Sequence, residues 1–289
     1  MLAWQTLDYL REFAFARQAV MAGVLIATAS AALSSIVVLK RLAFVGQGIS
    51  HAAFGGIGVV AILGLAGFAA ELVIFAFCLA SALLIAGLSR ARTREDTAIG
   101  IVLVATMALG FMLLGLRQNL MQWDVYREFL AGSPPVSGWD AILFGSIMVS
   151  GAAGVWMSAI VAGLVLLGLW WWRRPLMTYV FDEKTAEAAG VSTRAMRGLL
   201  LVLLALVVVV GMKVVGVVLV SALLVLPGAI AAQLCQRLVP TLIVCWVAAI
   251  LGVLGGLVAS LELSVPPGPA IVLVLVVEFA MSAILRRRR

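Results

Sequence analysis

The sequence predicts an all-α polytopic membrane protein with eight to nine transmembrane helices and one short cytoplasmic helix. Hydrophobic residues make up 64% of the 289 positions and charged residues only 11%, and the mean hydropathy is +1.20. Soluble domains are about half apolar and about a quarter charged, so this chain has more apolar surface than a soluble core can bury. The apolar residues form long runs, and we expect these runs to face lipid.

A transmembrane helix is expected wherever an apolar run is about 20 residues long, because that length crosses a hydrocarbon core about 30 Å thick. A shorter apolar piece, residues 226–236, lies at Pro227 and Gly228, which typically interrupt helices. Whether this piece crosses the membrane decides between eight and nine spans. The eight uninterrupted runs are residues 19–39, 46–66, 68–89, 96–116, 150–172, 198–221, 239–261 and 268–285.

The two ends of the chain differ from these runs. Residues 1–18 mix charged and apolar side chains and lack the continuous apolar stretch of a cleaved signal peptide, which favours an amphipathic segment lying in the membrane interface. The transmembrane domain then covers residues 19–285, and residues 286–289 form a basic tail. The three cysteines lie in apolar stretches without a CxxC pair and are interpreted as packing residues.

Lysine and arginine indicate the orientation, because they are enriched in cytoplasmic loops. If the arginine-rich loop at residues 89–96 is cytoplasmic and the short piece crosses, fifteen of the twenty basic residues lie inside, four outside and Lys213 within a span. The N-terminus is then outside and the tail inside. The formal net charge of +7 is therefore a topology signal, and no basic run alternates with aromatic residues as in a nucleic-acid surface.

Two stretches are neither plain loop nor plain span. Residues 117–140 are expected to form an outer loop with an interfacial or re-entrant helix. Residues 173–198 are the longest polar segment and are cytoplasmic in this orientation. Within them, residues 181–190 predict a short helix, because acidic residues occupy its first turn and Gly190 can end it. A short polar helix between two spans indicates a docking site for a partner.

The segment RLAFVGQGISHAAFGGIG, residues 41–58, contains the clearest candidate site. His51 is the sole histidine of the chain and has Gln47 four residues before it, so the two side chains share one helix face. Imidazole is a good ligand for zinc, manganese or iron, but a neutral histidine bonded to a neighbouring helix fits its position equally well. The glycines of this segment favour close contact between helices.

Other ionisable residues lie inside or near the spans. Lys213 is mid-span and is expected to face a partner helix or an aqueous cavity, because a charge facing lipid is costly. Glu71 and Glu262 lie near predicted helix ends, where water reaches them. Glu278 lies deeper and could pair with Lys213.

Several short motifs follow one another along the chain in a characteristic order. They are Ser50, His51 and Ala52; residues 95–100; LFGSI at 143–147; Phe181 and Asp182 with Ala186 and Gly190; VGVVLVSALL at 215–224 followed by Pro227; and PGPAIV at 267–272. This ordered set resembles the ABC-3 type metal permeases, the membrane subunits of ATP-binding-cassette importers for zinc, manganese or iron. The resemblance extends over about residues 17–285.

The resemblance implies roles for particular residues. His51 and Gln47 would contact the metal in the translocation path. The family commonly has aspartate where this chain has Gln47, and an amide oxygen is a poorer ligand than a carboxylate for such cations. A cytoplasmic coupling helix within residues 181–192 would meet the ATPase. Its expected contact residues are Phe181, Asp182, Ala186 and Gly190.

The resemblance also implies partners. The chain contains no GxxxxGK[ST] motif, so ATP hydrolysis is expected on a separate cytoplasmic ATP-binding subunit and this chain is not expected to be an enzyme. An extracytoplasmic metal-binding protein and a second copy of the permease, or a paralogue, are the other expected protein partners. The chain is expected in the lipid bilayer of the cell (inner) membrane. Nucleic acid is not expected as a partner. The metal is expected to be the substrate rather than a permanently bound cofactor.

Two other classes of protein share parts of this pattern. A secondary transporter or channel would have similar composition, but it needs acidic coupling-ion residues at mid-membrane, of which the chain offers few. An intramembrane enzyme would need a nucleophile or a second cluster of metal ligands beside His51, and the sequence offers no obvious one.

The orientation predicts that a cysteine placed at Thr93 reacts with a membrane-impermeant thiol reagent from the cytoplasmic side only, because the loop around it is rich in arginine. Labelling in intact cells is compared with labelling in inside-out vesicles. Reaction in intact cells would reverse the orientation and place residues 181–192 on the outer side.

Overall fold

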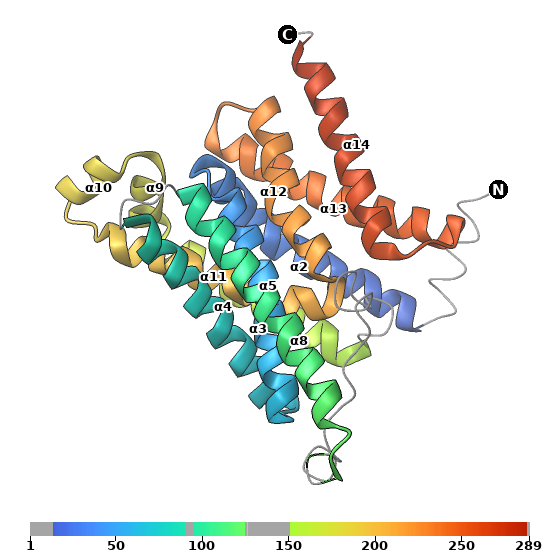
Figure 1. The fold of residues 1–289 in the computed structure, drawn as a ribbon. Coiled ribbons are helices and arrows are strands. Elements are labelled where there is room, and N and C mark those ends of the chain that lie inside the picture. The colour runs from blue at the N-terminus through green and yellow to red at the C-terminus, as the bar shows by residue number, and fades with distance from the viewer. Residues whose placement is uncertain (1–13, 91–94, 125, 127–150, 288–289) are drawn as a thin grey trace.

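A computed structural model describes residues 14–90, 95–124, 126 and 151–287. Within them, nine helices are long and apolar enough to cross a membrane, and Figure 1 shows the long helices as one inclined bundle with α9 and α10 at one end. The all-α polytopic class is confirmed, with the higher of the two expected span counts. The helices are α2 (Ala14–Leu39), α3 (Ala43–Leu63), α4 (Gly67–Arg90), α5 (Glu95–Leu120), α8 (Gly151–Trp171), α9 (Arg173–Phe181), α10 (Glu183–Ala188), α11 (Thr193–Val215), α12 (Val217–Leu234), α13 (Leu238–Leu263) and α14 (Pro267–Arg287).

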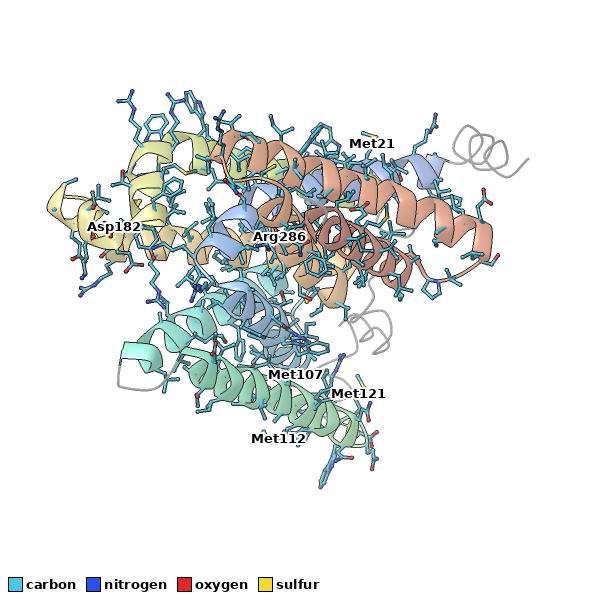
Figure 2. All side chains as sticks on the ribbon, turned by 90° about the horizontal axis from the view of Figure 1, so that it is seen from above. Met21, Met107, Met112, Met121, Asp182 and Arg286 are labelled. Carbon is cyan, nitrogen blue, oxygen red and sulfur yellow. The ribbon has the colours of Figure 1, made fainter. Side chains whose placement is uncertain are left out.

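The helices pack in two groups. In the first group α3 packs on α4 and, most extensively, on α5. In the second group α2 packs on α8, α12 and α13, and α14 packs on α12 and α13. Figure 2 shows the first group below the second. The groups meet along α11, which contacts α3 and α4 on one side and α8 and α12 on the other, and where α3 touches α12.

The boundary between α11 and α12 differs from the expected one. The break is at Gly216, so the expected span 198–221 ends early and the short piece 226–236 is part of a full-length helix. Gly216 has φ 89° and ψ 157°, a conformation essentially limited to glycine. Pro227 lies inside α12, and beside it the Gly228 N–H donates to the Ser34 hydroxyl of α2 at 2.8 Å. A neighbouring helix thus supplies a polar contact at the proline, and α12 continues through it.

The expected end segments lie only partly within the described residues. Helix α2 begins at Ala14, so residues 14–18 of the expected interfacial segment belong to the first span. Arg286 and Arg287 of the basic tail end α14. Residues 1–13, most of the expected outer loop 117–140, and the LFGSI motif at 143–147 are outside the described residues.

Glycines bring α3 and α5 into backbone contact. A Cβ atom on Gly110 would lie 2.5 Å from the carbonyl oxygen of Phe54, and one on Gly58 would lie 3.0 Å from the Cα of Gly110. Side chains cannot occupy such short distances, so this packing requires glycine at both positions. The contact fixes the position of α3, the helix that carries Gln47 and His51.

We expect Gly110→Ala to lower the free energy of unfolding by about 1–3 kcal/mol, the usual cost of overpacking, because the clash is with backbone that cannot rotate away. Gly115→Ala is the matched control on the same helix, since a Cβ there meets no atom within 4 Å. The control should be neutral or stabilise by up to about 1 kcal/mol, because glycine weakens a helix interior. Thermal unfolding in detergent compares the two variants. Equal midpoints would contradict the close packing of α3 on α5.

Candidate functional site

Gln47 and His51 lie one turn apart near the start of α3. The Gln47 side chain is exposed and His51 is partly exposed on the surface of the single chain. The His51 ring stacks on Phe54 with ring centroids 6.3 Å apart, and Phe54 stacks on Phe111 of α5 at 6.0 Å. The aromatic stack limits the orientation of the imidazole, while Gln47 is accessible from outside the helix bundle.

The imidazole has an unused polar atom. His51 Nδ1 is buried and has no hydrogen-bond partner among the described residues. The hypothesis that His51 is a structural histidine bonded to a neighbouring helix therefore receives no support at this nitrogen. Burying a polar atom without a partner is costly, so a ligand at Nδ1 would be stabilising, but the atom is covered within the chain and would first have to become accessible.

The described part of one chain offers too few ligands for a complete metal site. It contains no group of three or more histidine, cysteine, aspartate or glutamate side chains that could hold a metal ion. Gln47 and His51 supply one amide oxygen and one imidazole on the same face. Two such donors are fewer than the four or more that zinc, manganese or iron sites in proteins commonly have.

Helices α9 and α10 meet at Asp182. Its extended backbone ends α9 at Phe181 and begins α10, and its carboxylate accepts hydrogen bonds from the Lys184 N–H at 3.0 Å and from the Thr185 hydroxyl. These bonds, first that of Thr185, hold the pKa of Asp182 below its usual value. Gly190, with φ 77°, ends the segment: the Val191 N–H donates to the Ala186 carbonyl and the Gly190 N–H to that of Glu187.

The residues expected to form the docking surface differ in exposure. Phe181 belongs to α9 rather than to the short helix, and its side chain is 65% exposed. Ala186 is completely buried, which places it in the packing beneath α10. Asp182 and Gly190 act as the N-cap and the C-terminal stop. Sequence reasoning could not make this distinction, because α10 is too short to show a periodic apolar face.

Lys213 does not pair with Glu278. Its ammonium group lies 2.8 Å from a carboxylate oxygen of Glu71, one turn into α4, and both side chains are partly exposed. The pair joins α11 to the first group of helices. Glu278 Oε2 is buried and has no hydrogen-bond partner among the described residues. Cys78 and Cys245 are buried with their Sγ atoms close to backbone carbonyls, in agreement with packing roles.

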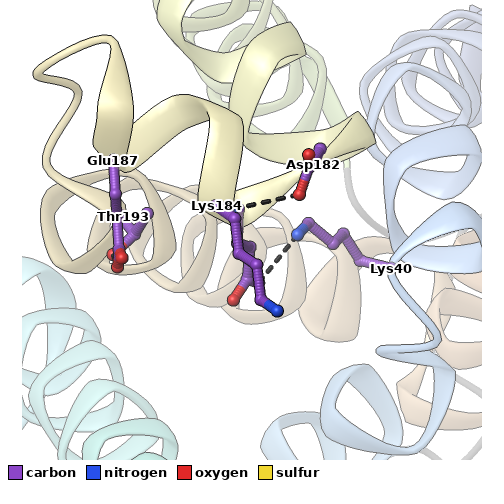
Figure 3. A network of polar contacts seen from close by, with 6 residues as sticks. Lys40, Asp182, Lys184, Glu187 and Thr193 are labelled. Atoms are coloured by element: carbon purple, nitrogen blue, oxygen red, sulfur yellow. Dashed lines mark hydrogen bonds and ion pairs between the residues drawn. The ribbon is translucent and has the colours of Figure 1, made fainter.

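In the sequence Lys40 is only one of the basic residues that indicate orientation, and the structure gives it specific contacts. Its Nζ lies 2.8 Å from Glu183 Oε1 of α10 and 3.9 Å from the centroid of the Tyr179 ring of α9. Figure 3 shows this contact beside Asp182 and Lys184. No local signal could have revealed it, because Lys40 and Glu183 are 143 residues apart.

Residues 12–286 match the family described as the ABC 3 transport family. The chain belongs to this family. A "probable metal transport system membrane protein" of Thermotoga maritima is 32% identical over 269 residues, covering 93% of this chain and 89% of that protein. The "manganese transport system membrane protein MntC" of Halalkalibacterium halodurans is 30% identical, covering 95% of this chain and 88% of that protein.

The fold of this ABC 3 family member is similar to a solved structure. PsaBC from Streptococcus pneumoniae, in complex with Fab, matches it with a TM-score of 0.81 at 28% identity, covering 98% of this chain and 95% of that chain. The match extends over both helix groups and over α9 and α10. The permease is thus a multi-pass membrane protein of the ABC transporter class.

We expect the hydrogen-exchange protection of the α10 amides to fall on acidification. The pKa of Asp182 is lowered by folding, so its charged form stabilises the cap above the unfolded pKa of about 3.9, and this contribution is lost as pH falls through the lower folded value. In Asp182→Asn the protection should be lower at neutral pH and should change less with acid.

The N-terminus of α11 serves as an internal control for this measurement. It is capped by the uncharged Ser192 hydroxyl, which accepts from the Ala195 N–H at 3.3 Å. Thr193, the first residue of α11, donates to the Glu187 carboxylate at 3.0 Å, so the comparison uses the Ala195 amide, whose protection factor should not follow the titration of Asp182. Protection of α10 that stays constant in acid would show that the Asp182 charge does not hold the helix.

Proposed function

We propose that this chain is the permease subunit of an importer for a divalent transition metal, with manganese, iron and zinc as the candidate substrates. Membership of the ABC 3 family supports the class of transporter. The observation that carries the site is the buried, unpartnered Nδ1 of His51, with the exposed Gln47 side chain one turn before it. A neutral nitrogen and a neutral oxygen on one face suit a cation that must bind and then leave.

A second permease chain would complete the site. A two-fold axis beside the start of α3 would bring two imidazoles and two amide oxygens to one path, giving four donors. The second chain is either an identical copy or a paralogue. The accessible position of Gln47 supports this arrangement, because its side chain is not covered by other helices of its own chain.

Glutamine in place of a carboxylate changes how strongly a metal is held. Gln47 carries no charge, so two copies of the pair would offer four neutral ligands and no charge neutralisation. We expect weaker resting occupancy and faster release than in a site with aspartate. The neutral site also favours metals that bind imidazole well over magnesium and calcium, which prefer charged oxygen ligands.

The energy source is a separate ATP-binding subunit that docks beside α9 and α10. Phe181 provides an exposed aromatic side chain at the α9 end, and the short α10 presents the charged residues Glu183, Lys184 and Glu187 to solvent. An extracytoplasmic binding protein would deliver the metal to the opposite side. Both partners follow from the family rather than from a contact within this chain.

A secondary transporter is the second candidate because of one observation. Glu278 Oε2 is a buried acid oxygen without a partner in the described residues of α14 and its neighbours, as a coupling-ion or proton site would require. Uptake into vesicles separates the two functions: an ABC importer needs ATP and its ATPase subunit, whereas a secondary transporter works from an ion gradient alone.

We expect His51→Ala to weaken metal binding by about tenfold or more, because even second-shell changes at metal sites commonly cost about 10–100-fold. Gln47→Asp should tighten binding, since it adds a charge beside the imidazole, and it should slow release. Manganese, iron and zinc binding to the detergent-purified protein is measured and normalised to folded protein.

The matched control for Gln47→Asp is Gln118→Asp, the same change at an exposed side chain near the other end of the first group, on α5. It should leave metal affinity unchanged. If His51→Ala lowered only the folded yield and bound metal as tightly as the unmodified protein, His51 would be a structural residue and the proposed site would be wrong.

A further inference from the structure

The corner between α2 and α3 has a fixed backbone geometry. Arg41 takes the left-handed conformation with φ 58°, which a residue with a side chain seldom adopts. The Leu42 N–H donates to the Val37 carbonyl at 2.7 Å and the Arg41 N–H to that of Val38 at 3.1 Å, the paired bonds of a Schellman stop. Lys40 is therefore the last residue of a well-defined helix end, and α3 starts three residues later at Ala43.

The Lys40 side chain is held by two contacts, one at a carboxylate and one at an aromatic ring. Its ammonium group is 2.8 Å from Glu183 of α10 and 3.9 Å from the ring centroid of Tyr179 of α9, and the side chain is only 12% exposed. An exposed lysine with one carboxylate partner contributes little, because both side chains are free to move. Lys40 instead has two partners on two helices and little access to water, which restricts its motion, although its carboxylate partner Glu183 is 57% exposed and water weakens that attraction.

This contact joins the docking helices to the candidate metal residues by a short route. From the start of α3, Gln47 lies about 6 Å and His51 about 12 Å along the helix axis. Helix α3 is in turn fixed against α5 by the contact of Gly58 with Gly110. A displacement of α10 would therefore act, through Lys40, on the corner that leads into α3.

Two routes connect α10 to α3. One is the corner at Lys40, a covalent link between the two groups that α9 and α10 contact through the Lys40 side chain. The other is α11, which follows α10 in the chain and packs on both α3 and α4. Helices α2 and α3 share little other surface, so the first route acts on α3 at its start. In Figure 3 the α2–α3 corner enters from one side and Lys40 extends across to α10.

We propose that Lys40 is the positioning residue that transmits movement of the docked ATPase from α9 and α10 to α3, and so sets the position of Gln47 and His51. The inference rests on the proposed function in one respect, the docking of an ATPase at α9 and α10. It does not depend on the identity of the transported substrate. Lys40 acts through Glu183 and Tyr179 and touches neither the metal nor the nucleotide.

The test uses a cysteine introduced at the exposed Gln47 position as a reporter of α3. Gln47→Cys is made in the permease, which is purified with its cognate ATPase. Alkylation of this reporter cysteine by a small maleimide is followed by mass spectrometry. The rate is compared with and without a non-hydrolysable ATP analogue. We expect the nucleotide to change the alkylation rate about fivefold or more, the lower end of typical coupling between sites. Adding Lys40→Met should remove most of this change while the ATPase stays bound.

Rescue and control variants separate positioning from a general loss of structure. The charge exchange Lys40→Glu with Glu183→Lys should restore part of the nucleotide response, because it rebuilds the ion pair in reverse but not the contact of a cation with the Tyr179 ring. Arg237→Met is the matched control: it removes an exposed cation from another helix corner, between α12 and α13, and should leave the response intact. Ordinary thermal stability of Lys40→Met confirms that the bundle is folded.

Two results would overturn the inference. The first is that the reporter cysteine responds to nucleotide equally with the Lys40→Met change and with Lys40 retained. The second is that the reporter cysteine does not respond to nucleotide even when Lys40 is retained. Metal uptake is measured separately on the same complex without the reporter cysteine. If that complex moves no metal but Lys40→Met still abolishes the response of the reporter, the proposed substrate is wrong and the role of Lys40 stands.

Discussion

The near absence of side-chain volume on two faces of α3 determines where this helix can lie. A Cβ on Gly56 would be 3.0 Å from the Cα of Ile74 in α4, and one on Gly58 would be equally close to Gly110 of α5. Lipid provides no hydrophobic force between helices, so backbone approach and van der Waals contact hold such an interface. With these faces committed to α4 and α5, the exposed Gln47 side chain is the part of the candidate site that a path or a second chain can reach directly.

The low dielectric of the membrane then decides which polar groups stay available. The Gly228 N–H is bonded to Ser34, and Lys213 is paired with Glu71, so these groups are satisfied within the fold. His51 Nδ1 and Glu278 Oε2 are buried without a partner in the described part of the chain. Groups of this kind are expensive in lipid unless a ligand, a proton or another chain satisfies them. Ser30 Oγ is also buried without a partner in the described residues, so a missing partner alone does not mark function; His51 and Glu278 are candidates because their side chains can also bind a metal or a proton.

Local signals predict the class and the family and leave eight or nine as the span count, because apolar run length and ordered motifs are properties of the linear sequence. They fail where the deciding partner is remote. The proline in α12 indicates a helix break, but Ser34, 194 residues from Gly228, lies beside it. Lys213 has Glu278 as a plausible partner in the sequence, whereas Glu71 is its partner from 142 residues away. The burial of Ala186 depends on how α9 and α10 fold back, and six residues of helix are too few to show it.

The two ion pairs lie at opposite ends of the first group. Lys40 and Glu183 act at the end where α3 begins, and Glu71 follows the end where α3 turns into α4. Between them the group is held by apolar packing and by the close approach of glycines. Glu183 is 57% exposed and the Lys213 and Glu71 side chains are 38% and 23% exposed, so water already reaches both pairs and lowers the free energy needed to separate their charges. The glycine contacts therefore hold the shape of the first group, and the two pairs set its position relative to the helices at its ends.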